Sequence, residues 1–558
     1  MSSESENKQK GITRRDFIKG GAVATVGLAA GGLLVGCDSS ASDSKDTKDT
    51  STASGEKKWS FETPPKPIKD SEIKKTVTAD VVIVGAGIAG MCAALSAAET
   101  GAKVAVVEKR EAYSVRGMHV AAIGTKIQAK KNVKIDYEQG VRDIIRWSGS
   151  SVKQELWWLW AEKSGESIDW LLDMCEEDGF SADLWASGYK GKDFYEYPGI
   201  THIFTGPNLA KFDSNRDFVE SVNKRAKEKG VDFHYKTQAA QLVRPDNDRV
   251  TGVIAKAEDD SYIKFEAKKA VILCCGDYGA DKEMKERYCP PALAVDADVF
   301  TPVGNNTGDG HKMGLWAGAA MQKAEPHAAM IHTQAGANSY CFLHVNKNGE
   351  RYSNEDATPQ LVCNAKQMEP DAIAWEVHDD NFLDELPKTI EIGGGMFWDQ
   401  VNRLWGQPWS REGEEMSVEM QMKSGNLVKA DTLDELAQKM EVPADKLKET
   451  VARYNELVKK GHDDDFHKNP KLLFPIEKAP FYAGKFKSAL LVVVGGLAIN
   501  DKMQVLDSKE EPIPGLYAAG NNAGDFFAKD YPTIFPGVSV SRAITFGRLA
   551  GQNAASEA

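Results

Sequence analysis

After residue 75 the chain alternates short apolar runs with longer stretches of small or mixed residues. Val81 to Val84 and Val104 to Val107 are two such runs, and a stretch of small residues lies between them. Apolar runs of this length predict buried strands, and the intervening stretch has the length of a helix. Residues 157–174 carry apolar side chains at helical spacing, so we expect an amphipathic helix whose tryptophans pack in the core.

The same pattern continues in the second half of the chain. Residues 268–284 predict a buried strand that ends in a glycine turn, and residues 512–525 predict a late strand that ends at Gly520. Residues 535–555 begin with a glycine turn and predict a C-terminal helix. Residues 442–466 predict a helix followed by a charged, solvated loop.

The first 37 residues differ from the rest. Arg14 and Arg15 precede a weakly apolar, glycine-rich run that ends in Leu-Val-Gly-Cys37. This order is typical of a twin-arginine export signal with a lipid-attachment cysteine. A membrane anchor is the alternative, but the run is near the lower length limit for a span. Residues 38–75 begin almost without apolar side chains, which predicts a disordered linker. We therefore expect export by the twin-arginine route and a lipid anchor at Cys37, on the outer face of the cytoplasmic membrane.

Composition limits the class of protein. The chain has 558 residues, enough for two or three domains. Its formal net charge of −13 argues against a nucleic-acid partner, because phosphate binding needs basic patches. Its eight cysteines include no CxxC pair and no spaced Cys/His cluster. We therefore expect neither a disulfide framework nor a metal site.

The residues between the first two apolar runs carry the strongest chemical signal. Gly85, Gly87 and Gly90 form G-x-G-x-x-G directly after the first run, and Glu108 follows the second. The first glycine permits a tight turn, the second lets a pyrophosphate approach the backbone, and the third allows close helix–strand packing. The helix N-terminus favours phosphate charge, and Glu108 is placed to bind ribose hydroxyls. The order of strand, helix, strand and acid predicts a dinucleotide site.

Later motifs extend this signal. They are "NTGDG" at 306–310, "VNKNGERYSNE" at 345–355, "IPGLYAAG" at 513–520 and "TFGRLAG" at 545–551. With the fingerprint, they make the chain resemble the flavoprotein family of fumarate reductase, succinate dehydrogenase, urocanate reductase and 3-ketosteroid dehydrogenase, from about residue 78 to the end.

The resemblance implies an α/β fold. It consists of a Rossmann-like FAD-binding domain of the glutathione-reductase type, into which an α+β capping domain is inserted. Transferred to this chain, the FAD-binding domain is residues 76–325 and 485–558, and the capping domain is residues 326–484. One FAD is expected between them. The residues expected to hold it are Gly85, Ala86, Gly87, Ala89, Gly90, Glu108, Lys109, Arg116, Gly276, Asp309, Gly520, Asn521, Gly537, Ser539 and Val540.

One histidine bears on how FAD is attached. Succinate dehydrogenases carry a flavin-linked histidine in a segment similar to residues 116–125. Here Met118 holds the linking position, and His119 comes one place later. A shift of one residue in an extended segment turns a side chain to the other face, so we expect non-covalent FAD. His119 either faces flavin and substrate or is a core histidine, and both readings remain open.

The chain departs from the dicarboxylate reductases of this family. Those enzymes place a proton-donating arginine soon after the Asn-Glu pair, and further cations around the substrate carboxylates. Here Pro359 stands at the arginine position, and no arginine lies between Asp525 and Ser541. The tail instead resembles ketosteroid dehydrogenases, in which a Tyr-Pro pair precedes a glycine whose N–H binds a ketone. Tyr531 and Gly537 match these two residues, although a merely packed tyrosine is the alternative.

Two further histidines complete the candidate catalytic set. His327 and His332 lie at the expected junction with the capping domain, where they line the substrate pocket or pack at the hinge. The candidate catalytic residues are Tyr531, Gly537, His119, His327 and His332.

We expect an exported FAD-dependent oxidoreductase that acts on CH–CH groups. The favoured activity is reduction of an α,β-unsaturated, non-dicarboxylate substrate such as a steroid-like or aromatic enone. Electrons would come from a membrane or extracytoplasmic donor, for example a separate cytochrome. Two alternatives remain: a ketosteroid-type dehydrogenase that runs in the oxidative direction, and a flavin electron-transfer subunit without its own substrate.

Overall fold

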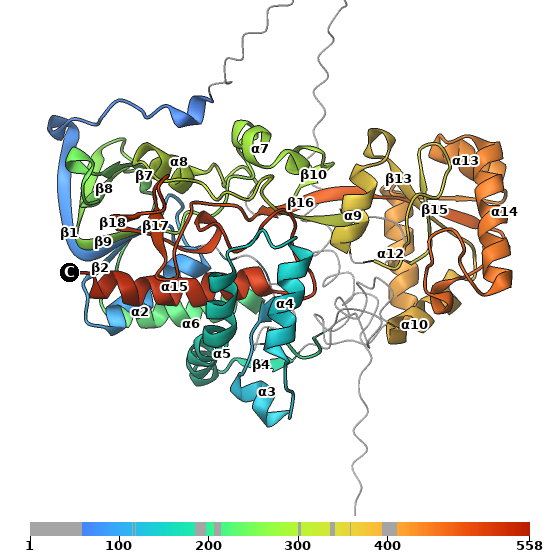
Figure 1. The fold of residues 1–558 in the computed structure, drawn as a ribbon, viewed down its shortest axis with the longest axis horizontal. Helices are drawn as coiled ribbons and strands as arrows, with labels where there is room; N and C mark the ends of the chain where they lie inside the picture. Colours follow the sequence, from blue (N-terminus) through green and yellow to red (C-terminus); the bar gives the residue numbers. More distant parts are fainter. Residues whose placement is uncertain are drawn as a thin grey trace, which may run out of the picture.

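The protein has a larger and a smaller lobe, joined by a small sheet (Figure 1). The computed structural model describes residues 59–113, 115, 117, 119–184, 197–205, 214–299, 303–334, 341–357, 359–392 and 410–558. Within these residues, no helix combines the length and the apolar character that a bilayer crossing requires.

The larger lobe is built on a mixed eight-stranded sheet with parallel central strands. Val81 to Val84 pair in register with Val104 to Val107, and on the other side with residues 270–273. Strands that are covered on both faces are expected to be continuously apolar, as these are. The strands are, in sheet order, β17 (Gln504–Leu506), β18 (Pro512–Ala518), β9 (Tyr262–Leu273), β1 (Ile73–Val84), β2 (Val104–Val107) and β6 (Asp232–His234), with β8 (Gly252–Lys256) on β9 and β7 (Gln238–Val243) on β8.

Helices pack beside this sheet (Figure 1). They are α2 (Ile88–Glu99), α5 (Gln154–Glu177), α6 (Ser214–Glu228) and α15 (Val538–Ser556). Small residues let α15 lie against α2, because a Cβ atom on Gly547 would stand 2.4 Å from the Ala89 carbonyl oxygen. The predicted α/β fold with a parallel dinucleotide-type sheet is confirmed.

Two tryptophans attach α5 to the C-terminal region. Trp157 and Trp160 are buried, as the helical spacing predicted. The Trp157 indole N–H donates to the Phe526 carbonyl oxygen at 2.6 Å, and that of Trp160 donates to the Ser541 hydroxyl at 2.9 Å. These bonds fix the start of α15 against the helix layer.

A three-stranded antiparallel sheet lies beside α15. It contains β3 (His119–Ala121), β5 (Thr201–Thr205) and β4 (Ser181–Leu184), and α3 (Lys126–Lys130) and α4 (Tyr137–Trp147) follow β3 in the chain. His202 in β5 is buried; its Nε2 lies 2.8 Å from the Thr125 hydroxyl and its Nδ1 3.2 Å from the Val120 carbonyl oxygen. Burial lowers the pKa of His202 to about 4, so it holds β3 in place as a neutral ring.

The smaller lobe has its own sheet and core. Its strands are, in order, β12 (Leu343–Asn346), β13 (Ala374–His378), β15 (Phe481–Lys485) and β14 (Leu427–Ala430), and its helices are α10 (Phe382–Ile392), α12 (Arg411–Lys423), α13 (Leu433–Met440) and α14 (Ala444–Lys460). The joining sheet contains β10 (Ala297–Asp298), β16 (Lys487–Val493) and β11 (Ala329–Gln334), and α9 (Pro359–Gln367) packs on β11. The other helices are α7 (Lys282–Tyr288) and α8 (Asp309–Trp316).

Candidate active site

The fingerprint turn has the geometry that its glycines predicted. Gly85 has φ +103°, and its N–H donates to the Val107 carbonyl oxygen at 2.8 Å. A Cβ atom on Gly85 would stand 2.4 Å from the Cys274 carbonyl oxygen, and one on Gly90 would stand 1.9 Å from the Gly85 carbonyl oxygen. Helix α2 begins after Gly87 with no side chain capping its N-terminus. Its first N–H groups are therefore available to an anion.

Glu108 and Lys109 follow β2 beside this turn. The Glu108 carboxylate accepts the Ala86 N–H at 2.7 Å and the Arg110 N–H at 2.9 Å. Lys109 forms an ion pair with Asp309 at 3.0 Å, which ties β2 to the first residue of α8. A carboxylate has about four lone-pair sites, so Glu108 keeps accepting capacity for ribose hydroxyls.

The turn after β9 and the turn before α8 lie next to each other at the carboxyl end of the sheet. Gly276 has φ +85°, and Gly308 has φ +72° where it begins α8. The Asn306 amide donates to Asp277 at 2.8 Å, and the Thr307 hydroxyl donates to Asp309 at 2.7 Å. These bonds hold the two turns together at the carboxyl end of the sheet.

The turn after β18 is joined to α8 by a neutral histidine. Gly520 has φ +62°, and a Cβ atom there would stand 2.9 Å from the Ala89 Cβ of the fingerprint helix. The Asn522 amide and His311 Nδ1 are 3.2 Å apart, and His311 Nε2 lies 3.1 Å from the Asn521 carbonyl oxygen. Burial lowers the pKa of His311 to about 4. The turn is therefore anchored to both α2 and α8.

The start of α15 meets β3. Gly537 precedes α15 with φ +87°, and a Cβ atom on it would stand 2.4 Å from the backbone carbon of His119. The Ala121 N–H donates to the Gly537 carbonyl oxygen at 3.3 Å. Gly537 has no side chain that could cap this helix N-terminus. His119 is partly exposed in β3, and Val540 lies against Gly117. The structure therefore brings His119, Gly537, Ser539 and Val540 to one place.

Tyr531 lies behind this helix terminus. Its ring stacks on Phe527 with centroids 5.1 Å apart, and its side chain is buried. Its hydroxyl oxygen accepts the Ser539 N–H at 3.4 Å. Burial raises the pKa of Tyr531 to about 12, so the phenol is neutral at neutral pH.

His327 lies in an aromatic cluster. Its Nδ1 lies 2.6 Å from the Tyr278 hydroxyl, and its ring stacks on Tyr288 at 5.0 Å. Burial lowers the pKa of His327 to about 3, so it is neutral. His332 pairs with Ala489 through the backbone of β11 and β16.

Helix α9 begins at Pro359, the position at which the dicarboxylate reductases have their acid arginine. The Gln360 side chain accepts the Ile331 N–H at 2.9 Å, and its amide donates to Asp530 at 3.0 Å. Asp530 also accepts from the Trp147 indole at 3.1 Å. The loop before Tyr531 is therefore tied to α9 and α4. The sequence does not reveal these contacts, because the residues that form them lie far apart in the chain.

The predicted residue Arg116 and the predicted signal at 1–37 lie outside the described residues.

Comparison with known proteins assigns the family. The family model described as "FAD binding domain" matches residues 80–532. The chain belongs to this family. It is 26% identical over 501 residues to the vinyl phenol reductase of Lactiplantibacillus plantarum, with 85% of this chain and 96% of that protein covered. It is 28% identical over 538 residues to a probable fumarate reductase of Shewanella frigidimarina, with 89% and 82% covered.

A solved structure supports the fold of this FAD-binding protein. The 3-ketosteroid-Δ4-(5α)-dehydrogenase of Rhodococcus jostii superposes with a TM-score of 0.69 at 24% identity, covering 88% of this chain and all of that one (100%). FAD is therefore the cofactor, and the protein is an FAD-dependent oxidoreductase that acts on carbon–carbon bonds.

The residues present fit FAD. The N-terminus of α2, which no side chain caps, offers N–H groups to the anionic parts of the cofactor. In α15 the Val538 and Ser539 N–H groups already donate to the Phe535 carbonyl oxygen and the Tyr531 hydroxyl. The glycine turns at Gly85, Gly276 and Gly520 keep Cβ atoms out of the space along the sheet edge. FAD supplies hydride transfer to this site when it is bound.

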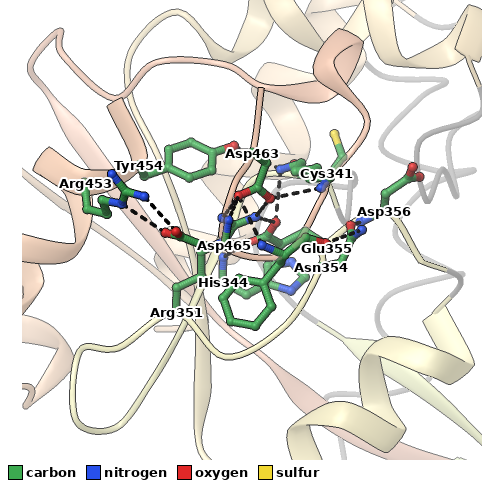
Figure 2. A network of polar contacts seen from close by, with 12 residues as sticks. Cys341, His344, Arg351, Asn354, Glu355, Asp356, Arg453, Tyr454, Asp463 and Asp465 are labelled. Atoms are coloured by element: carbon green, nitrogen blue, oxygen red, sulfur yellow. Dashed lines mark hydrogen bonds and ion pairs between the residues drawn. The ribbon is translucent and has the colours of Figure 1, made fainter. Parts of the chain in front are cut away.

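The smaller lobe holds a buried ionic network (Figure 2). Arg351 binds Glu355 and Asp463, each with a closest N–O distance of 2.8 Å. Lys468 lies 3.3 Å from Glu355. Arg351 and Glu355 come from the sequence motif at 345–355, which the network attaches to the loop after α14. These residues hold the smaller lobe together.

Proposed function

We propose that this chain is an exported FAD-dependent ene-reductase for an α,β-unsaturated carbonyl compound that is not a dicarboxylate, such as a steroid-like or aromatic enone. The segment before α15 carries the proposal. From Asp525 to Ser541 it contains no arginine, and its lysine, Lys529, is exposed. Arg542 follows, but it is buried and directs both terminal nitrogens at protein oxygens. A second substrate carboxylate would be buried without a matched cation, which costs several kcal/mol.

Tyr531 and Gly537 are the groups that we propose for the substrate carbonyl. The Ser539 N–H fixes the Tyr531 oxygen, so the O–H hydrogen is left for a second partner. The Gly537 N–H offers a second donor without side-chain bulk. Two donors on the carbonyl oxygen would stabilise the negative charge that develops there when hydride reaches the β-carbon.

The relatives support this choice in part. Similarity to a vinyl phenol reductase favours substrates without two carboxylates. Similarity to a probable fumarate reductase is the reason that fumarate has to be tested directly. We infer that electrons come from a membrane or extracytoplasmic donor such as a separate cytochrome, because the sequence has one dinucleotide fingerprint.

The test is anaerobic reoxidation of the dithionite-reduced protein by a panel of alkenes. The panel contains fumarate, a monocarboxylic enoate, a vinyl phenol and a steroid enone. We expect rapid reoxidation by the steroid enone or the vinyl phenol and negligible reoxidation by fumarate. Robust fumarate reduction would show that the role given to the missing arginines is wrong. Reoxidation by none of them, with rapid transfer to a cytochrome, would favour an electron-transfer subunit.

A further inference from the structure

Arg542 is a buried cation without a carboxylate partner. It lies in α15, is 0% exposed, and forms no ion pair among the described residues. Its Nη2 donates to the Asn521 side-chain oxygen at 2.7 Å and its Nη1 to the Ala523 carbonyl oxygen at 3.2 Å. Its Nε has no hydrogen-bond partner in the part of the chain that the structure describes. A buried charge is normally paired, so this arginine needs an explanation.

The surroundings of Arg542 compensate the charge only partly. The guanidinium carbon lies 4.9 Å from the Phe527 ring centroid and 5.7 Å from that of Phe526, close enough for cation–π attraction. Burial lowers the pKa of Arg542 to about 10, and the neighbouring Tyr531 opposes that shift. The side chain is therefore charged at neutral pH, and Tyr531, the titratable group that acts on it, is a neutral phenol.

The position of Arg542 points to the missing anion. Five residues before it, Gly537 meets His119, and five residues after it, Gly547 meets Ala89 of the fingerprint helix. At 1.5 Å per residue, Arg542 is about 7.5 Å along the helix from each contact. Its partner Asn521 belongs to the turn at the carboxyl end of β18, the edge of the sheet at which a dinucleotide binds. Arg542 thus lies on α15 between its contacts with β3 and with the fingerprint helix, and it is bonded to the turn that follows β18.

We propose that Arg542 supplies an uncompensated positive charge that favours the negative charge gained by FAD on reduction, and so raises its reduction potential. Two electrons from an external reductant and one proton convert the neutral flavin ring to an anion. A neutral Asn521 leaves the arginine charge unmatched, whereas a carboxylate there would cancel it. The pyrophosphate has the same charge in both redox states, so an effect on pyrophosphate alone would leave the potential unchanged. The proposal rests on FAD as cofactor and is independent of the substrate.

The test measures the midpoint potential of the FAD-loaded full chain by dye-coupled reduction. Asn521→Asp keeps the size of the side chain and places a carboxylate 2.7 Å from the guanidinium. Arg542→Met removes the charge, and Arg542→Lys keeps it. Asn553→Asp is the matched control, since it adds the same charge at a partly exposed site on α15, about 16 Å along the helix from Arg542.

We expect Asn521→Asp and Arg542→Met each to lower the equilibrium constant for two-electron reduction about tenfold or more, which is about 30 mV. Arg542→Lys and Asn553→Asp should stay within about threefold of wild type. If a variant releases FAD, the ratio of the Kd values of oxidised and reduced FAD gives the same quantity. An unchanged potential, or an unchanged Kd ratio, in both Asn521→Asp and Arg542→Met would overturn the proposal and assign Arg542 to packing or to pyrophosphate binding.

Discussion

Replacement of Glu355 by Gln should destabilise the smaller lobe. Glu355 is fully buried and accepts from Arg351 Nε and Nη2, both at 2.8 Å, and from the His344 N–H at 3.2 Å (Figure 2). Burial alone would raise the pKa of Glu355, but Lys468 and Arg351 outweigh it and lower the pKa from 4.5 to about 2. A shift of that size is worth about 3 kcal/mol of unfolding free energy at neutral pH.

The pH dependence follows from the sign of this shift. The folded-state pKa is below the unfolded value, so the stabilisation is fully present above about pH 4.5 and is lost as the pH falls towards about 2. Glu355→Gln lacks this ionisation. Its deficit relative to wild type should be about 3 kcal/mol at pH 7 and should shrink steadily below pH 4.5.

The assay is urea unfolding of the FAD-loaded protein, followed by tryptophan fluorescence at several pH values. Glu456→Gln is the matched control, because Glu456 is 69% exposed and pairs with Arg453 at the surface of α14. It should unfold like wild type. A deficit below about 1 kcal/mol for Glu355→Gln at pH 7, or one that persists unchanged at pH 3, would refute the ionic account of this network.

Three further predictions follow from the cofactor site and the N-terminus. Glu108→Ala should weaken FAD binding to the apoprotein by about 1–3 kcal/mol in a fluorescence titration, because the Ala86 N–H loses its buried acceptor; affinity equal to wild type would contradict this. Acid precipitation should release the flavin colour into the supernatant, and colour in the pellet would instead indicate a covalent link, for which His119 is the first candidate. Cys37→Ala should yield protein without an acyl group by mass spectrometry, and a lipid-modified variant would exclude Cys37 as the anchor.

The sequence predicts the cofactor turn well because local backbone geometry dictates it. Gly85 has a positive φ, which favours glycine, and a Cβ atom on Gly90 would collide with the Gly85 carbonyl oxygen of the same strand–turn–helix unit. The close approach of Cys274 to Gly85, by contrast, depends on the neighbouring strand β9. The helix in 157–174 could also be predicted, because the burial of Trp157 and Trp160 follows from the helical spacing of its apolar residues.

Electrostatic interactions between residues far apart in the chain could not be predicted from the sequence pattern. Arg542 looks like an ordinary polar residue of a helix, and its lack of a carboxylate depends on which side chains the fold brings beside it. The pair of Arg351 with Glu355 is local, but Asp463 joins it from 112 residues away. Similarly, burial lowers the pKa of His327 and keeps it neutral, and the residues that pack around it, such as Tyr278 and Tyr288, come from other parts of the chain.

Tyr531 offers the sharpest test of the proposed chemistry. Its hydroxyl oxygen is held by the Ser539 N–H in the first turn of α15, beside Gly537. A pKa of about 12, raised by burial, keeps the phenol protonated between pH 6 and pH 9, so its donor function should not titrate in that range. A packing role would need the ring stacked on Phe527, and phenylalanine preserves that stack. The hydroxyl and the ring are therefore separable by one substitution.

Tyr531→Phe should lower turnover of the alkene found in the panel by about 10²-fold or more across pH 6–9, the usual effect of losing one donor to a developing oxyanion. FAD content and unfolding temperature should stay unchanged. Tyr517→Phe is the control, because that buried tyrosine in β18 bonds Glu557 and should leave turnover unaltered. If fully flavinated Tyr531→Phe turns over like wild type, Tyr531 does not hold the carbonyl, and the next residue to test is His119, which lies beside Gly537.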